Sequence, residues 1–226
     1  MKKYKYQLHT HTAPTSRCAV MTPKELAEAL KENGYQGAVM TNHFFYGNSG
    51  IDRNIPWCDF VREYEKDYLA CKKEAEKYDL DIIFCIEQHI GEGREIIPYG
   101  ITPDFLYSHP DLKCAGIDEW CDAVKKVDAL IIQAHPYRDR AYISAPYPLD
   151  PNKIDGIEVY NYANTPVCNE RAEEFAKAHP DMILTSGADT HSPGTVGFGG
   201  IECEERIKDT AALVNVLRNG NYKILR

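Results

Sequence analysis

The chain has 226 residues, which is enough for one large α/β domain with a substantial core. Its composition, 43% hydrophobic and 27% charged, is that of a globular protein. The formal net charge of −8 argues against nucleic acid held by a generally basic surface, but it leaves anionic substrates open, because bound metal ions would reverse the sign locally.

The eight cysteines are spread irregularly and form no CxxC pair, so neither a disulfide framework nor a paired-thiolate zinc site is indicated. Several, such as Cys85, lie in apolar runs where a free thiol packs as a small hydrophobic group. The chain begins with lysines but lacks the apolar stretch of a signal peptide, and no segment approaches membrane-spanning length. We therefore expect a soluble cytoplasmic protein with reduced thiols and no membrane partner.

The first part of the chain alternates between strand-like and helix-like segments. An aromatic and apolar run predicts a strand over residues 4–8, and the capping box that starts at Thr22 predicts a helix that stops at Gly34. A buried strand is predicted over residues 35–41. Residues 44–56, rich in Gly, Asn and aromatic side chains, form a loop long enough to indicate a functional role.

The alternation continues to the end of the chain. Further strands are predicted over residues 81–87, 96–101, 129–135, 156–161, 182–189 and 222–226. Further helices are predicted over residues 58–78, 118–127, 167–178 and 209–218. Strands that are apolar on both faces and separated by helices indicate a parallel sheet covered by helices. Roughly seven or eight such units predict a closed or nearly closed βα barrel, in a single domain over residues 1–226.

Polar side chains gather where the predicted strands end. His9 and His11 follow the first strand, and alternate residues of an extended segment point to one face, so both imidazoles could reach one metal ion. For an isolated pair of this kind, two polar residues at a strand end are the more ordinary interpretation. The other strand ends add a set of similar residues: His43, Glu87, His135, Glu158, Asn161, Asp189 and His191.

Five histidines together with carboxylates on one rim are hard to explain by packing. In a parallel βα architecture, functional sites form at the carboxyl ends of the strands. Imidazole and carboxylate ligands suit zinc, manganese or iron(II), and two-metal sites favour phosphoryl and hydrolytic chemistry. The pattern therefore predicts a metal centre in a hydrolase.

Five segments, in this order and spacing, resemble the PHP (polymerase and histidinol phosphatase) family: LHTHT, TNH, FCIEQHI, IIQAHPYR and SGADTH. The resemblance implies a distorted (β/α)7, TIM-like barrel that binds two or three divalent metal ions, which are zinc, manganese or iron. It also implies hydrolysis of a small-molecule phosphate ester, such as histidinol phosphate or a nucleotide, by a metal-activated hydroxide.

The resemblance further implies which residues bind each ion. One ion would be held by His9, His11, Glu87 and Asp189. Glu87 would bridge to a second ion that His135 also binds. His43 and His191 correspond to ligands of a third ion.

Three positions depart from the family pattern. Arg17 stands where the family usually has histidine or aspartate, Asn42 where it usually has aspartate, and Glu95 where it commonly has histidine. A carboxylate at 95 can still bind metal, whereas a guanidinium stays protonated and only donates hydrogen bonds. His89 or His109 could substitute for the missing imidazole, although His109 precedes a proline in what reads as a loop or helix start.

Two arginines are candidates for binding the substrate phosphate. Arg17 is expected to replace part of the charge of the third ion and to clamp a phosphate, as planar guanidinium groups do well. Arg138, just after the AHPY turn, is the second candidate. The alternative for each is a solvated arginine beside an acidic residue.

Two other functions fit the same residues. The metal site could hydrolyse a bond other than a phosphate ester, because related metal-barrel sites also cleave amides. Alternatively, the chain is a metal-binding module that lost efficient catalysis, with Arg17 and Asn42 as marks of decay. The sequence lacks GxSxG and Walker-type loops, so no serine nucleophile or phosphate-binding loop is indicated.

Overall fold

The computed structural model describes residues 2–226. Its strands are β1 Tyr4–Thr10, β2 Gly37–Met40, β3 Asp81–Phe84, β4 Gln88–His89, β5 Glu95–Tyr99, β6 Leu130–Gln133, β7 Gly156–Asn161, β8 Ile183–Gly187, β9 Ile201–Cys203 and β10 Tyr222–Ile224. Its helices are α1 Pro23–Glu32, α2 Trp57–Glu76, α3 Pro103–Ser108, α4 Ile117–Lys125, α5 Pro166–Ala178 and α6 Thr210–Asn219, with 3₁₀ segments η1 Pro110–Cys114 and η2 Pro193–Thr195. Within the described residues, no helix has both the length and the apolar composition needed to cross a bilayer.

The strands form two five-stranded sheets, in the orders β10-β9-β1-β2-β3 and β4-β5-β6-β7-β8. Strands β1 to β3 are parallel, as are β6 to β8, but β5 runs antiparallel to both of its neighbours, and so does β9. Among residues 2–226 the two ladders stay separate. The class is α/β as predicted, but the prediction of a closed βα or (β/α)7 barrel is wrong.

The barrel is absent because the alternation of strands and helices breaks down in the middle of the chain. A tight turn joins β4 to β5, where Gly91 and Gly93 take left-handed backbone angles of φ 102° and 79°. A hairpin reverses the chain direction, so β5 enters its sheet antiparallel. Residues 134–155, all of them described, connect β6 to β7 without an α-helix. The apolar run therefore predicted β5 as a strand but not its direction.

Local signals at the element ends are mostly confirmed. In the capping box of α1, the Thr22 side chain accepts a hydrogen bond from the backbone N–H of Glu25 and the Glu25 carboxylate accepts from that of Thr22. The helix stops before Gly34, which takes the left-handed φ of 71°. The predictions missed α3, β4 and β9, because each is too short to show a periodic pattern.

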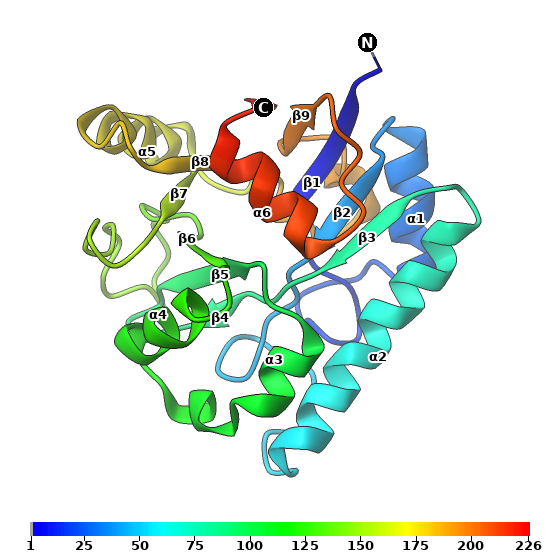
Figure 1. Ribbon diagram of the computed structural model, residues 1–226, viewed down its shortest axis with the longest axis horizontal. Coiled ribbons are helices and arrows are strands. Elements are labelled where there is room, and N and C mark those ends of the chain that lie inside the picture. The colour runs from blue at the N-terminus through cyan, green and yellow to red at the C-terminus, as the bar shows by residue number, and fades with distance from the viewer. Residues whose placement is uncertain (1) are drawn as a thin grey trace.

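Packing rather than a continuous ladder joins the two sheets. In Figure 1, β1 to β3 lie beside α1 and α2, the strands from β4 to β7 lie on the other side, and α6 passes in front. Side chains of both sheets and of α6 share one buried cluster, which includes Leu8, Ile83, Ile97, Ile132 and Leu213. Burying one such side chain fully stabilises the fold by roughly 1.5–3 kcal/mol.

Backbone hydrogen bonds bring the carboxyl ends of four strands together. His11 N donates to Thr190 O at 2.9 Å, and Thr190 N donates to His9 O at 3.2 Å, which sets the end of β1 beside the end of β8. Glu87 N donates to Asn42 O at 3.0 Å, which ties the segment after β3 to the end of β2. The strand ends that carry the polar residues therefore lie together, although the two sheets do not close into a barrel.

Candidate metal centre

Glu87 lies at the centre of this rim, fully buried beyond the end of β3. His9 Nε2 and His135 Nε2 each lie 3.0 Å from Glu87 Oε1. His43 Nδ1 lies 2.8 Å from Glu87 Oε2. A carboxylate with imidazoles against both oxygens has the arrangement of a ligand that bridges two ions.

Asp189, just after β8, is the second carboxylate of the centre. Its Oδ1 lies 3.1 Å from His11 Nε2 and 3.5 Å from His9 Nε2. Its Oδ2 accepts a hydrogen bond from the buried guanidinium of Arg138, which also donates to Asn161 Oδ1 at 3.0 Å. Arg138 therefore holds this carboxylate with its other oxygen turned toward the imidazoles.

Hydrogen bonds at the Nδ1 atoms of His9 and His11 fix the orientation of the two rings. His9 Nδ1 donates to Glu158 Oε1 at 3.1 Å. His11 Nδ1 lies 3.1 Å from Ser16 Oγ, and because that hydroxyl donates to Asn42 Oδ1 at 2.8 Å, the ring donates to the serine. Both rings therefore carry a proton on Nδ1 and turn Nε2 toward the carboxylates, which is the orientation of a metal ligand.

Two residues of the centre, His135 and Asp189, have left-handed backbone angles, with φ of 31° and 52°. Such angles cost roughly 1–3 kcal/mol for a residue other than glycine and concentrate at functional sites. In both places the unusual backbone carries a side chain that reaches toward the cluster.

Four buried atoms at the centre have no hydrogen-bond partner among the described residues: His9 Nε2, His11 Nε2, His43 Nδ1 and Glu87 Oε2. A buried polar atom without a partner costs roughly 1–3 kcal/mol, so four at one point indicate a place for a cation. Imidazole nitrogen and carboxylate oxygen are donors that suit zinc, manganese and iron(II). The residues present therefore fit divalent metal ions.

The possible ligands form four overlapping groups, in each of which the donor atoms lie within 4.8 Å of one another: His9–His11–Asp189, His9–Glu87–His135, His43–Glu87–Glu95 and His11–His43–His191. We call His9, Glu87, His135 and Asp189 the inner cluster, and each of them is at most 5% exposed. We call His11, His43 and His191 the outer cluster, because it borders the solvent through His191, whose side chain is 28% exposed.

The carboxylates give the inner cluster a strong preference for positive charge. Burial lowers the pKa of His9, but the charges of Glu158, Asp189 and Glu87 outweigh burial and raise that pKa well above its usual value. Burial alone would raise the pKa of Glu87, yet the imidazoles of His9 and His43 hold it well below its usual value. A cation placed among these groups would gain the same attraction as a proton on His9.

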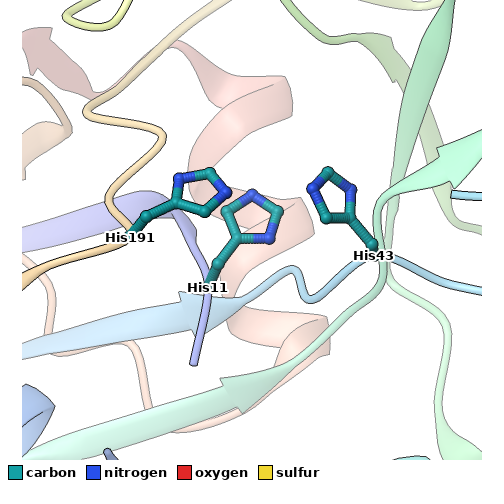
Figure 2. Close-up of side chains that lie close together, drawn as sticks. All are labelled: His11, His43 and His191. Atoms are coloured by element: carbon teal, nitrogen blue, oxygen red, sulfur yellow. The ribbon is translucent and has the colours of Figure 1, made fainter. Parts of the chain in front are cut away.

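The outer cluster consists of three imidazoles in contact. Figure 2 shows His11 between His191 and His43, with ring centroids 4.2 Å and 4.4 Å away. Burial, and then the neighbouring rings of His191 and His43, lower the pKa of His11 well below its usual value. The central ring therefore stays neutral between two rings whose pKa values are raised by acidic or thiol neighbours.

A cavity of about 450 Å³ opens from the cluster to the solvent. Its volume lies within the range of roughly 300–1,000 Å³ that is usual for small-molecule sites. Its wall contains residues of the cluster and neighbouring side chains: Cys18, His43, Tyr46, His89, Glu95, Arg138, Tyr142, Asp189 and His191. A small molecule in this cavity would therefore touch the groups of the centre directly.

All seven side chains predicted as metal ligands meet at this one place. Glu95, the carboxylate that stands in place of a histidine, also reaches it from the start of β5. Its Oε1 lies 3.6 Å from His43 Nδ1, and its Oε2 lies 3.4 Å from His135 Nε2. Glu95 is thus placed to complete the ligand set that His135 begins.

The remaining candidates are distributed differently. His89 lines the cavity, whereas His109 stacks on Phe105 at the end of α3, with ring centroids 4.3 Å apart. Arg138 lies in the cavity wall, but Arg17 is exposed and is not among the residues that line the cavity. The binding of phosphate by either arginine stays a prediction.

Asn42, a second departure from the family pattern, belongs to a buried network beneath the centre. Its Nδ2 donates to Asp67 Oδ2 at 2.7 Å, and its Oδ1 accepts from Thr12 N at 2.7 Å. Burial raises the pKa of Asp67, although the hydrogen bonds from Thr12 and Asn42 oppose the shift. An amide suits a position that must donate to one neighbour and accept from another.

Two residues of the site were given no role from the sequence. Glu158 can approach His9 because position 187 is glycine: a Cβ on Gly187 would meet His9 Cβ at 2.4 Å and Glu158 Oε1 at 2.6 Å. Cys18 lines the cavity beside the outer cluster. Its signal in the sequence was its place directly after Arg17, where the resemblance led us to expect a ligand.

Comparisons with known proteins give a partial family match and a shared fold. A family model for PHP-associated sequences matches residues 167–222, which include Asp189 and His191. No curated protein matches the chain in a sequence search.

Solved structures share the fold at low identity. A two-domain protein from Bacteroides vulgatus that contains a predicted PHP-like metal-dependent phosphoesterase is 13% identical with a TM-score of 0.71, over 99% of this chain and 64% of its own. The lesion-specific endonuclease PfuEndoQ from Pyrococcus furiosus is 16% identical with a TM-score of 0.66, over 99% of this chain and 58% of its own. An amidohydrolase from Chromobacterium violaceum is 13% identical with a TM-score of 0.59, over 98% of each chain. The chain thus spans less than two thirds of the first two proteins.

Proposed function

We propose that this chain is a metal-dependent hydrolase of small-molecule phosphate esters. The match of residues 167–222 to PHP-associated sequences and the fold shared with a protein that contains a predicted PHP-like metal-dependent phosphoesterase support the proposal. The observation that carries the proposal is the meeting of unpartnered ring nitrogens and a central carboxylate beside an open cavity. The chemistry of the donors and their burial both favour divalent cations over a structural role for so many polar groups.

The ligands divide around Glu87. His9, His11 and Asp189 would hold one ion. His135 would hold a second together with Glu95, whose Oε2 lies 3.4 Å from His135 Nε2, with Glu87 between the two. When bound, these ions would activate a water molecule for attack on phosphorus and neutralise charge on the phosphoryl oxygens. We take zinc, manganese or iron as the candidates.

Other side chains of the protein would orient these ligands and the substrate. Glu158 and Ser16 hold the rings of His9 and His11 through their Nδ1 atoms. Arg138 holds Asp189 and adds a fixed positive charge to the cavity wall, which favours an anionic substrate. The arginine is already bonded to neighbouring carboxylate and amide oxygens, so it acts on a phosphate from a fixed position.

The lining of the cavity favours a small substrate whose leaving group contains a ring. Tyr46 and Tyr142 stand in its wall and are 45% and 67% exposed, so both can pack against a planar group. The net charge of −8 disfavours binding of long nucleic acids through the surface at large. We also propose a cytoplasmic location, in keeping with eight free thiols.

An assay of the purified protein with an aryl phosphate, in manganese, zinc or iron(II), tests the proposal. We expect metal-dependent turnover that is lost in both His9→Ala and Asp189→Ala, with the folded state checked by circular dichroism. A panel of phosphorylated metabolites would then identify the substrate.

The same assay separates the alternatives. Bound metal without turnover on any phosphate ester would favour the decayed binding module, and turnover on amides would favour a hydrolase of a different bond. Cleavage of a DNA oligonucleotide, added because a structural neighbour is an endonuclease, would contradict the choice of a small molecule.

A further inference from the structure

Ser16 and Asn42 carry a series of hydrogen bonds from the His11 ring to α2. His11 Nδ1 lies 3.1 Å from Ser16 Oγ, which lies 2.8 Å from Asn42 Oδ1. Asn42 Nδ2 in turn lies 2.7 Å from Oδ2 of Asp67, a residue of α2. All four residues are buried, so solvent does not compete for these hydrogen bonds. Each bond in the series therefore limits the direction of the next.

The orientation of the Asn42 amide is fixed from both sides. The backbone N–H of Thr12 can only donate, and it donates to Asn42 Oδ1 at 2.7 Å. On the other side, Asp67 Oδ2 accepts from Asn42 Nδ2 and from Thr12 Oγ. An inverted amide would set its N–H₂ against the Thr12 N–H and its oxygen against the carboxylate. The amide oxygen therefore faces Ser16.

The Ser16 hydroxyl has one proton, and the groups around its oxygen fix where that proton points. His43 N donates to Ser16 Oγ at 3.0 Å, which occupies one lone pair. The hydroxyl itself donates to Asn42 Oδ1, so only a lone pair is left for His11. His11 Nδ1 must therefore donate, and the neutral ring keeps the lone pair of Nε2 free for a cation.

We propose that Asn42, held by Asp67, is a positioning residue that selects the metal-binding tautomer of His11 through Ser16. This inference rests on the proposed metal centre and assigns a role to a side chain that would touch neither ion nor substrate. It also accounts for the amide at a position where the PHP family usually has aspartate. An ionised aspartate would likewise accept from Ser16, but only the amide can also donate to Asp67.

Removal of the acceptor at position 42 should reverse the series. In Asn42→Ala the Ser16 hydroxyl would turn to donate to His11 Nδ1, which would move the ring proton to Nε2. A protonated Nε2 cannot bind a cation, so we expect the affinity for zinc to fall by about 10–100-fold. Adding Ser16→Ala removes the misdirected hydroxyl, so the double variant should bind zinc more tightly than Asn42→Ala alone. If the two residues only packed the structure, the double variant would bind most weakly.

Two measurements test the proposal, and one of them needs no metal. Nitrogen-15 spectra of the metal-free protein show whether Nδ1 of His11 carries a proton, with His11→Gln used to identify its signals. Competition with a chromophoric chelator gives the zinc affinity of the wild type, Asn42→Ala, the double variant and Asn42→Asp, which keeps an acceptor for Ser16. Ser49→Ala is the matched control, because Ser49 is a buried serine whose Oγ accepts from Ile51 N.

We expect His11 Nδ1 to be protonated in the wild type and unprotonated in Asn42→Ala. Zinc should bind most weakly to Asn42→Ala, and Ser49→Ala should bind it as the wild type does. An unprotonated Nδ1 in the wild type, or a double variant weaker than Asn42→Ala, would overturn the proposal. The wild-type spectrum decides even if a variant fails to fold.

The same measurements separate this inference from the proposed function. A protonated Nδ1 in a wild-type protein that hydrolyses no phosphate ester would support the hydrogen-bond series and contradict only the proposed function. Turnover by a protein whose His11 Nδ1 carries no proton would contradict only the role of Asn42.

Discussion

The inner and outer clusters differ in how much of each is fixed by the framework. The inner side chains lie at or just after strand ends and are almost fully buried. His9 is oriented by donating to Glu158, and Asp189 by accepting from Arg138. The outer cluster takes His43 from the end of β2 and His191 from a loop, and it opens to the cavity through His191 and Cys18. Rigid, buried ligands favour tight and permanent binding, whereas an open position allows ligands and substrate to exchange.

This difference indicates that the two clusters have different roles. Ions in the inner cluster would be resident, and an ion in the outer cluster would be the one most sensitive to the choice of metal and to the substrate. Glu87, of the inner cluster, also contacts the outer one, because one of its oxygens lies against His9 and His135 and the other against His43. Its replacement is therefore the strongest test.

Glu87→Gln should have the largest effect. The change keeps the shape of the side chain but removes the negative charge that three imidazoles share, and it turns an amide N–H₂ toward one of them. We expect kcat/KM to fall by more than about a hundredfold, which exceeds the range typical for residues that only orient a ligand. Elemental analysis should show metal lost from both clusters.

The control for this prediction is Glu158→Gln, which keeps an acceptor near His9 Nδ1 and touches only the inner cluster. The metal affinity of this variant should fall by about 10–100-fold. Its kcat/KM should fall less than that of Glu87→Gln. Equal losses of kcat/KM in the two variants would show that Glu87, despite its contacts with both clusters, matters no more for activity than Glu158.

Gly187→Ala should disturb the inner cluster alone. The added Cβ would lie 2.4 Å from His9 Cβ and 2.6 Å from Glu158 Oε1, so the pair must separate. We expect metal-dependent activity to fall by about 10–100-fold, as for the loss of a residue that orients a ligand. Elemental analysis should still show an ion bound at the outer cluster.

The matched control is Gly194→Ala, because a Cβ there meets no atom within 4 Å. Its activity should equal that of the wild type. If Gly187→Ala also leaves activity unchanged, the contact between His9 and Glu158 does not position the inner cluster.

The histidine and carboxylate ligands of both clusters could be predicted from the sequence, because an apolar run followed by His, Glu or Asp marks a strand end whatever the topology. The direction of β5 could not, since a hairpin and a crossover begin with the same apolar strand. Cys18 was missed because its loop has no periodic pattern, and its position depends on hydrogen bonds from distant segments.

Asn42→Asp tests the network below the outer cluster through the pH dependence of stability. A carboxylate at 42 would face Asp67 Oδ2, which now accepts from Asn42 Nδ2 at 2.7 Å. The pair would share a proton, so its pKa in the folded state would lie above that in the unfolded state, as burial already causes for Asp67. Its contribution to stability is therefore present below the unfolded pKa and is lost as the pH rises through the folded value.

We expect the free energy of unfolding of Asn42→Asp to fall relative to wild type on going from mildly acidic to neutral pH. The slope should reach about 1.4 kcal/mol per pH unit while the folded state holds the extra proton. Urea titrations of metal-free protein at several pH values would measure it. Asn42→Ala, which adds no carboxylate, should lose a similar amount of stability at every pH, and a parallel pH profile for the two variants would refute the shared proton.

Arg17→Ala should have the smallest effect, because this side chain is exposed outside the cavity wall. If Arg17 attracts the substrate phosphate, its removal should raise KM up to about fivefold, since exposed ion pairs contribute up to about 1 kcal/mol, and kcat should not change. Added salt should shrink the difference, because screening weakens exposed pairs first. Arg62→Ala, at an exposed position on α2, is the control for the loss of one positive charge. Equal KM values in all three proteins would assign phosphate binding to the bound ions and Arg138 and leave Arg17 as a solvated surface residue.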